Sequence, residues 1–161
     1  PKDVPVRVLL GRALVRAGRL GEALEVARYC VSISEHNPLS YIVLGDVMAA
    51  KGEFEAAVSA YDKALVLAPR QFECHLKLGH AYIRLGYIDK AEAELRKAMD
   101  LSPNHPDVLY WWGKLLWAKG DRQTAKKIFQ KALEQRPIGD HTYQVPYKEI
   151  VAALSSANAP S

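Results

Sequence analysis

The sequence predicts an all-α fold, a solenoid in which antiparallel pairs of helices stack one after another. Three observations lead to this prediction. A pattern of small and bulky residues recurs at a spacing of 34 residues, each copy contains two segments of helical length, and a glycine separates the two segments. Self-similarity at such a period is typical of stacked helical repeats rather than of one globular core. The recurring positions are Leu44, Gly45, Gly52, Ala57, Tyr61, Ala64 and Pro69, then Leu78, Gly79, Gly86, Ala91, Leu95, Ala98 and Pro103, then Trp112, Gly113, Gly120, Ala125, Phe129, Ala132 and Pro137.

Four copies of the unit account for most of the chain. The first copy fits less completely than the others, because Glu35 stands where the later copies have proline. Repeats grow by stacking, so the length of this chain counts repeats, and we predict one repeat domain over 1–161. Its four units of 34 residues contain 136 of the 161 residues (4 × 34) and are 4–37, 38–71, 72–105 and 106–139.

Each unit is expected to form one helix, turn at a glycine and return through a second helix. Asn37 followed by Pro38 predicts a helix start, with a capping side chain and proline at the first helical position. The same device recurs at 104–106. A left-handed residue commonly ends a helix, and the glycines placed to do so are Gly18, Gly52, Gly86 and Gly120.

A second set of glycines lies inside the first predicted helices. Glycine there costs about 1 kcal/mol relative to alanine, so we expect close approach of the paired helix to compensate. The predicted contacts place Gly45, Gly79 and Gly113 against Ala57, Ala91 and Ala125, with Tyr61, Leu95 and Phe129 filling the space beyond.

The repeat breaks after Gly139, because Pro146 stands in the slot that holds Leu44 in the second unit. Residues 140–145 predict a loop, and 146–156 predict a helix that covers the apolar side of the last unit, as solenoid ends require. The tail, 157–161, is expected to fray. The predicted apolar face of the terminal helix consists of Tyr147, Ile150, Val151 and Leu154.

The amino-terminal edge is predicted to lack a capping helix of its own. Val4, Val6 and Val8 make it apolar. We therefore expect this edge either to join further repeats or to mediate self-association.

The glycine, alanine, aromatic and proline positions of these units resemble those of the tetratricopeptide repeat (TPR) family. The resemblance extends over all four units and implies a right-handed superhelix whose first helices line a concave groove for a peptide or a partner protein. Carried over position by position, the groove of that family gives the candidate site residues Arg12, Arg16, Ile42, Asp46, Lys77, His80, Arg84, Tyr110, Lys114 and Trp117.

Basic and aromatic residues dominate this set. Arg12 and Arg16 are spaced i, i+4 and so point the same way, and His80 and Arg84 repeat that spacing. Large rigid side chains such as Trp117 are common at binding hot spots. We therefore predict a partner segment, extended or helical, that carries acidic groups and an apolar anchor.

Three other interpretations of the same residues stay open at this point. The two arginines of the first unit would equally well be solvated surface charges. Trp117 would also fit as packing against the terminal helix, and Asp46 as the ion-pair partner of a neighbouring arginine. The chaperone-binding members of the family hold a terminal carboxylate with a set of basic and asparagine residues that does not occur here, so a cochaperone role is disfavoured.

No catalytic constellation occurs in the sequence. Phosphate-binding loops, His-Glu-x-x-His and Cys-x-x-Cys are missing. His75 and His80 are five residues apart, so they do not share a helical face as two zinc ligands would. We expect a non-catalytic protein without a cofactor, with His75 packed in the core and Cys30 and Cys74 as small core residues.

The leading functional interpretation is a protein-interaction scaffold, for example for assembly of a larger complex. The alternative is the TPR region of a larger enzyme or of a secretion or exopolysaccharide-export component, where it would dock partners. Nucleic-acid binding is disfavoured, because acidic residues interrupt the basic row and the net charge is only +4. No apolar run approaches a membrane span, so membrane insertion is not expected. The cytoplasm is the favoured compartment, and the periplasm would fit a processed or fragment chain.

Overall fold

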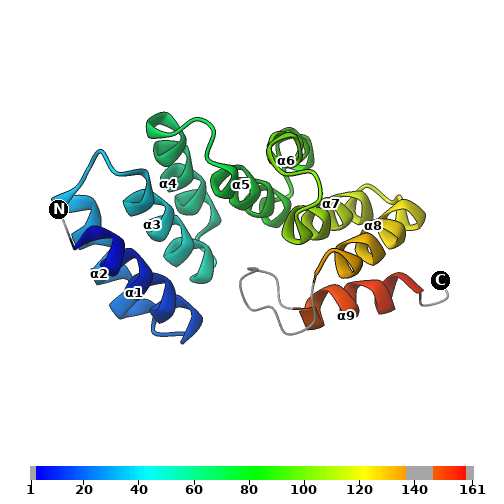
Figure 1. The fold of residues 1–161 in the computed structure, drawn as a ribbon, viewed down its shortest axis with the longest axis horizontal. Coiled ribbons are helices and arrows are strands. Elements are labelled where there is room, and N and C mark those ends of the chain that lie inside the picture. Colours follow the sequence, from blue (N-terminus) through cyan, green and yellow to red (C-terminus); the bar gives the residue numbers. More distant parts are fainter. Residues whose placement is uncertain (1–2, 137–146, 159–161) are drawn as a thin grey trace.

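A computed structural model describes residues 3–136 and 147–158, and in these two ranges it consists of α-helices without any strand (Figure 1). The predicted all-α class is therefore confirmed. The helices are α1 (Val4–Arg16), α2 (Leu20–Ile33), α3 (Pro38–Ala50), α4 (Phe54–Leu67), α5 (Phe72–Leu85), α6 (Ile88–Leu101), α7 (Pro106–Ala118), α8 (Arg122–Glu134) and α9 (Tyr147–Asn158).

The first eight helices form four consecutive pairs, and each pair packs on the next. α1 packs with α2, α3 with α4, α5 with α6 and α7 with α8, while α2 contacts α3, α4 contacts α5 and α6 contacts α7. The first helices of neighbouring pairs also touch, α1 with α3 and α5 with α7. The pairs run in chain order from the amino-terminal to the carboxy-terminal end (Figure 1), which is the predicted solenoid.

The helix boundaries follow from local chemistry that the sequence indicates. The Asn37 side chain accepts a hydrogen bond from the backbone N–H of Leu39 at 3.0 Å, as expected for a cap before proline. At the start of α7 the capping side chain is His105, whose Nδ1 accepts from the Asp107 N–H at 3.2 Å. The four predicted turn glycines all have positive φ, between 72° and 88°, a conformation that a side chain would strain.

The glycines inside the first helices face the bulky residue of the second helix. A Cβ placed on Gly79 would lie 2.5 Å from Leu95, and one on Gly113 would lie 2.5 Å from Phe129. Gly45 has the same relation to Tyr61. The nearest contact is thus made by the bulky residue itself, not by the alanine that we expected in front of it. The space left by a glycine on one helix, which we call a socket, accepts a large side chain of the other helix.

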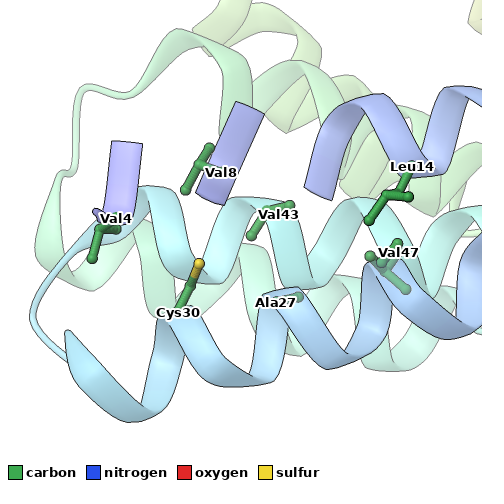
Figure 2. Packing of buried hydrophobic residues seen from close by; sticks show 8 residues of the cluster. Val4, Val8, Leu14, Ala27, Cys30, Val43 and Val47 are labelled. Carbon is green, nitrogen blue, oxygen red and sulfur yellow. The ribbon is translucent and has the colours of Figure 1, made fainter. Parts of the chain in front are cut away.

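In the first helix pair, a different residue packs against the helical glycine. Ala27 stands at the position of Tyr61, and the nearest side chain of α2 is Val26, 3.6 Å from where a Cβ on Gly11 would lie. Val43 of α3 approaches instead, 2.7 Å from where a Cβ on Gly11 would lie. Figure 2 shows the resulting cluster, which draws on α1, α2 and α3 together and so joins the first unit to the second. The labelled members are Val4, Val8, Leu14, Ala27, Cys30, Val43 and Val47.

The terminal helix α9 packs on α8. Ile150 is fully buried and joins a cluster with Ala125, Phe129 and Ala132. Val151 is 37% exposed, so the expectation that it shares the buried face is wrong. The side chain of Tyr147, the predicted loop at 140–145, Pro146 and the end of the tail at 159–161 lie outside the described residues.

At the amino-terminal edge, Val4 and Val8 are buried, whereas Val6 and Leu9 are 67% and 66% exposed. The apolar edge is thus provided by the outer face of α1, and self-association through it stays a prediction. Cys30 and Cys74 are free and buried, as expected of core residues. Within the described parts of the chain, every helix is too short or too polar to cross a bilayer.

Candidate functional site

The first helices of the first three units surround a pocket of about 300 Å³, which we call the groove pocket. Half of the predicted site residues line it, and they come from three separate helices. Its lining residues are Arg12, Val15 and Arg16 of α1, Asp46, Ala49 and Ala50 of α3, Tyr61 of α4, and Glu73, Lys77 and His80 of α5.

Small residues of α3 make room for this pocket. Ala49 and Ala50 occupy the two positions at which the next unit has Ile83 and Arg84. With only methyl groups at the centre of the row, a hollow is left between α1 and α5. The same repeat geometry with larger side chains would fill it.

Four charged side chains at the pocket form a closed ring of alternating sign, the four-ion ring of Arg12, Asp46, Glu73 and Lys77. Arg12 Nη2 donates to both carboxylate oxygens of Glu73 at 2.8 Å. Lys77 Nζ lies 2.5 Å from Asp46 Oδ1 and 3.5 Å from Glu73 Oε1. Arg12 Nε closes the ring at 3.8 Å from Asp46 Oδ2. Each carboxylate therefore meets two cations, and the ring links the first, second and third units.

The ring is largely shielded from solvent, with 11 to 29% of each side chain exposed. Burial alone would raise the pKa of Glu73, but Lys77 and Arg12 outweigh it and hold that pKa below its ordinary value. The Tyr61 hydroxyl donates to Asp46 at 2.9 Å, and burial together with the Asp46 charge raises the pKa of Tyr61. Asp46 thus acts as an ion-pair partner, one of the open interpretations, with Lys77 nearer to it than Arg12.

An aromatic row continues the site from His80 towards α7. The His80 ring stacks on Trp111 with centroids 3.9 Å apart and meets Phe54 edge-on at 5.9 Å. Burial, with smaller contributions from Arg84 and Lys77, lowers the pKa of His80 to about 4, so the imidazole is neutral near pH 7. The exposed Arg84 lies over the Phe54 ring at 4.8 Å.

Two predicted site residues are inaccessible, which corrects the expectation that they face a ligand. Ile42 is fully buried in a cluster with Ala64 and Cys74. Tyr110 is 7% exposed, and its ring packs 5.9 Å from that of Phe129. Their shared repeat position faces the paired helix here, so their side chains support the groove wall from behind.

The other predicted residues lie on the rim or further along. Arg16 is exposed at the pocket mouth. Lys114 is half-buried on α7, outside the pocket. Trp117 is partly buried against the cluster that includes Ile150 of α9, with Arg122 over its ring at 5.1 Å. Trp117 therefore has the packing role that the sequence left as an alternative.

The ten predicted site residues do not include Glu73 and Trp111, which the structure places at the site. Both lie at or beside repeat positions that face the groove, so position was the available signal. His75 is buried, as predicted, with Nδ1 2.7 Å from Glu94 Oε2 and Nε2 3.1 Å from the Pro69 carbonyl oxygen. Among the described residues, no group of three or more His, Cys, Asp or Glu side chains is arranged to hold a metal ion.

Comparison with known families agrees with this architecture. Family models described as tetratricopeptide repeat or TPR repeat match residues 4–28, 45–86, 72–105 and 107–137. The chain belongs to the tetratricopeptide repeat family. Repeats of this family serve in general as protein-interaction scaffolds and are generally non-enzymatic.

Two curated relatives are similar to this chain over part of their own length. BBSome complex member BBS4 of Bos taurus is 32% identical over 160 residues, which is 96% of this chain and 31% of the relative. Human protein O-mannosyl-transferase TMTC2 is 33% identical over 97 residues, 58% of this chain and 12% of that protein. The chain thus spans less than a third of the length of either relative.

Solved structures share the fold closely. A thermophilic TPR protein of Thermus thermophilus is 28% identical, with a TM-score of 0.82 over 98% of this chain and 82% of that one. The hetero-tetramer of Cut9 and Hcn1 from the APC/C matches with 25% identity and a TM-score of 0.86, over 96% of this chain and 29% of the other. Both matches extend over nearly the whole chain.

Proposed function

We propose that this chain is a non-catalytic scaffold that binds a segment of a partner protein along the first helices of its repeats, as part of a larger assembly. The observation that carries the proposal is the groove pocket, where α1, α3 and α5 converge on one hollow. Pockets with apolar walls and a few converging polar groups are the usual form of a binding site.

The chemistry around the pocket supports a partner with acidic groups and an apolar anchor. Arg16 and Arg84 are exposed cations on the same side of the first helices, at equivalent repeat positions. The stacked rings of His80 on α5 and Trp111 on α7 add aromatic surface. Because the four-ion ring neutralises itself, the rim arginines rather than Arg12 and Lys77 are the cations for a partner's carboxylates.

A charge-reversal experiment tests this proposal. Affinity capture with the wild-type chain is compared with capture by the Arg16→Glu/Arg84→Glu variant, and captured proteins are identified by mass spectrometry. The matched control is Arg28→Glu/Lys131→Glu, which makes the same charge change at exposed positions of the second helices. We expect the rim variant to lose its partner and the control to keep it. Equal capture by both variants would refute groove binding.

The alternative candidate is a docking module within a larger enzyme or within a secretion or exopolysaccharide-export component, and the TMTC2 match supports the first of these two forms. That relative is far longer than the region it shares with this chain. Isolating the intact cellular polypeptide with an antibody against these repeats, and measuring its mass and peptides, distinguishes the two candidates. A catalytic domain on the same polypeptide would favour the second.

A further inference from the structure

The groove pocket has two kinds of wall. Val15, Ala49 and Ala50 provide apolar surface from α1 and α3. The four-ion ring and the His80 imidazole provide polar surface from α1, α3 and α5. At about 300 Å³ the pocket is at the small end of ligand sites, which suits one large side chain rather than a stretch of peptide.

The charge balance of the ring limits what the polar wall accepts. Two cations and two carboxylates are paired with one another at 2.5 to 3.8 Å, so the ring has no net charge to offer. A charged group brought into this shielded site would lose its water without gaining a counter-ion of its own, or would have to break an existing pair.

A purely apolar side chain is also a poor match. It would cover the polar atoms of the ring and of His80 without replacing the hydrogen bonds that water makes to them, and such loss is costly. The neutral imidazole both donates and accepts, because its pKa is lowered to about 4. Tyr61 already shows what the ring accepts, since its hydroxyl donates to Asp46 at 2.9 Å.

We propose that the groove pocket binds one uncharged amphipathic side chain of the partner, a tyrosine, with its ring against Val15, Ala49 and Ala50 and its hydroxyl at the four-ion ring and His80. The inference rests on the proposed function and assigns the apolar anchor to this pocket. The partner's acidic groups then flank the tyrosine and meet Arg16 and Arg84 on the rim.

Three small probes of matched shape test the anchor chemistry. N-acetyl-tyrosinamide, N-acetyl-phenylalaninamide and N-acetyl-4-carboxyphenylalaninamide differ only in the tip of the ring, and their binding is followed by NMR shifts of Val15, Ala49 and His80. We expect the tyrosine probe to bind about tenfold more tightly than either of the others, the cost of one unmade hydrogen bond or unpaired charge. Equal or tighter binding of the carboxylate probe would overturn the inference, as would the absence of shifts at the pocket.

Two variants locate and explain the binding. Ala50→Leu fills the pocket and should abolish the shifts, whereas Ala118→Leu, at the same exposed position of the fourth unit, should not. Glu73→Gln leaves the ring with one excess positive charge, so the preference should switch to the carboxylate probe. A ring with only a structural role would not change the order of the probes.

The same variants separate this inference from the proposed function. If Arg16→Glu/Arg84→Glu loses the captured partner but Ala50→Leu keeps it, the groove binds without a tyrosine in the pocket, and the inference is wrong. If neither variant affects capture, the proposed partner site is wrong, and the inference that rests on it fails with it even where the tyrosine probe binds the pocket.

Discussion

The two ends of the solenoid are built from the same repeat but use different packing. At the amino-terminal end, the small residues Ala49 and Ala50 leave space, and the four-ion ring spans three units beside it. At the carboxy-terminal end, Phe129, Tyr110 and neighbouring tryptophans fill the space, and α9 covers the last pair. One end adds paired charges around a hollow to an aliphatic core, and the other end is filled by aromatic rings.

This difference suggests that the two ends of the solenoid have different roles, one in ligand binding and the other in stability. Stacked repeats contact mainly their neighbours, so each end can be altered with limited effect on the other. We therefore expect stability to depend most on the aromatic end, and ligand selection to depend most on the pocket end. Substitutions at the two ends test that division.

Removal of a large, fully buried ring should cost the most. Phe129→Ala deletes a fully buried side chain that fills the socket above Gly113, and such substitutions cost about 3–5 kcal/mol. Urea unfolding, followed by circular dichroism, measures the loss. Ala27→Leu is the counterpart in the first unit, where Val43 already occupies the space, and overpacking should cost only about 1–3 kcal/mol. A larger cost at Ala27 than at Phe129 would reverse the comparison.

Filling a glycine socket should separate a helix pair in the middle of the solenoid. Gly79→Val places a branched side chain where Leu95 lies only 2.5 Å from the position that a Cβ would take, so we expect a loss of about 1–3 kcal/mol in urea unfolding. Gly21→Ala is the control, because Gly21 is a helical glycine with open space around it. That change should be neutral or stabilise by up to about 1 kcal/mol. A gain at both positions would show that helix propensity rather than close packing decides.

Breaking the four-ion ring should lower stability in a way that depends on pH. Glu73→Gln removes one carboxylate from between Arg12 and Lys77, and the loss at neutral pH should be about 1–3 kcal/mol. The pKa of Glu73 is lowered in the folded protein from an ordinary value of 4.5, so its stabilisation is present above that value and is lost as the pH falls through the folded pKa. Unfolding midpoints of wild type and variant should therefore converge in acid. A gap that stays constant as the pH falls well below the ordinary value would contradict the ring's role.

Much of the fold could be predicted because it depends on local and periodic signals. The spacing of Gly45, Gly79 and Gly113 indicates the repeat, and Asn37 with Pro38 indicates a helix start. These features act within one helix or between two neighbouring helices, so predicting them needs no knowledge of the superhelix. The contacts between these glycines and the bulky residues of the paired helices were close to expectation for the same reason.

The candidate site was less predictable, because it depends on how the units stack. Arg12 and Glu73 are 61 residues apart, and only the stacking and curvature of three successive units bring them within 2.8 Å. Ile42 and Tyr110 were assigned to the groove by repeat position, yet their side chains are buried against neighbouring helices. Periodicity locates a face of the solenoid, but the pairing and burial on that face depend on side chains from three helices at once.

The smallest expected effect is at an exposed ion pair, which serves as a reference for the shielded four-ion ring. Arg19 and Glu22 form a two-point contact, with Nε to Oε1 at 2.7 Å and Nη2 to Oε2 at 2.5 Å, as short as the contacts of the ring. Their side chains are 60% and 54% exposed, and they are three residues apart. Water and salt screen such a pair, so Arg19→Ala should change the free energy of unfolding by less than about 0.5 kcal/mol. Because the hydrogen-bond geometry is comparable, the difference from Glu73→Gln measures the effect of shielding and of joining separate units. A loss at Arg19 equal to that at Glu73 would show that ion-pair geometry alone sets the energy. Shielding and the link between units would then add nothing to the stability that the ring provides.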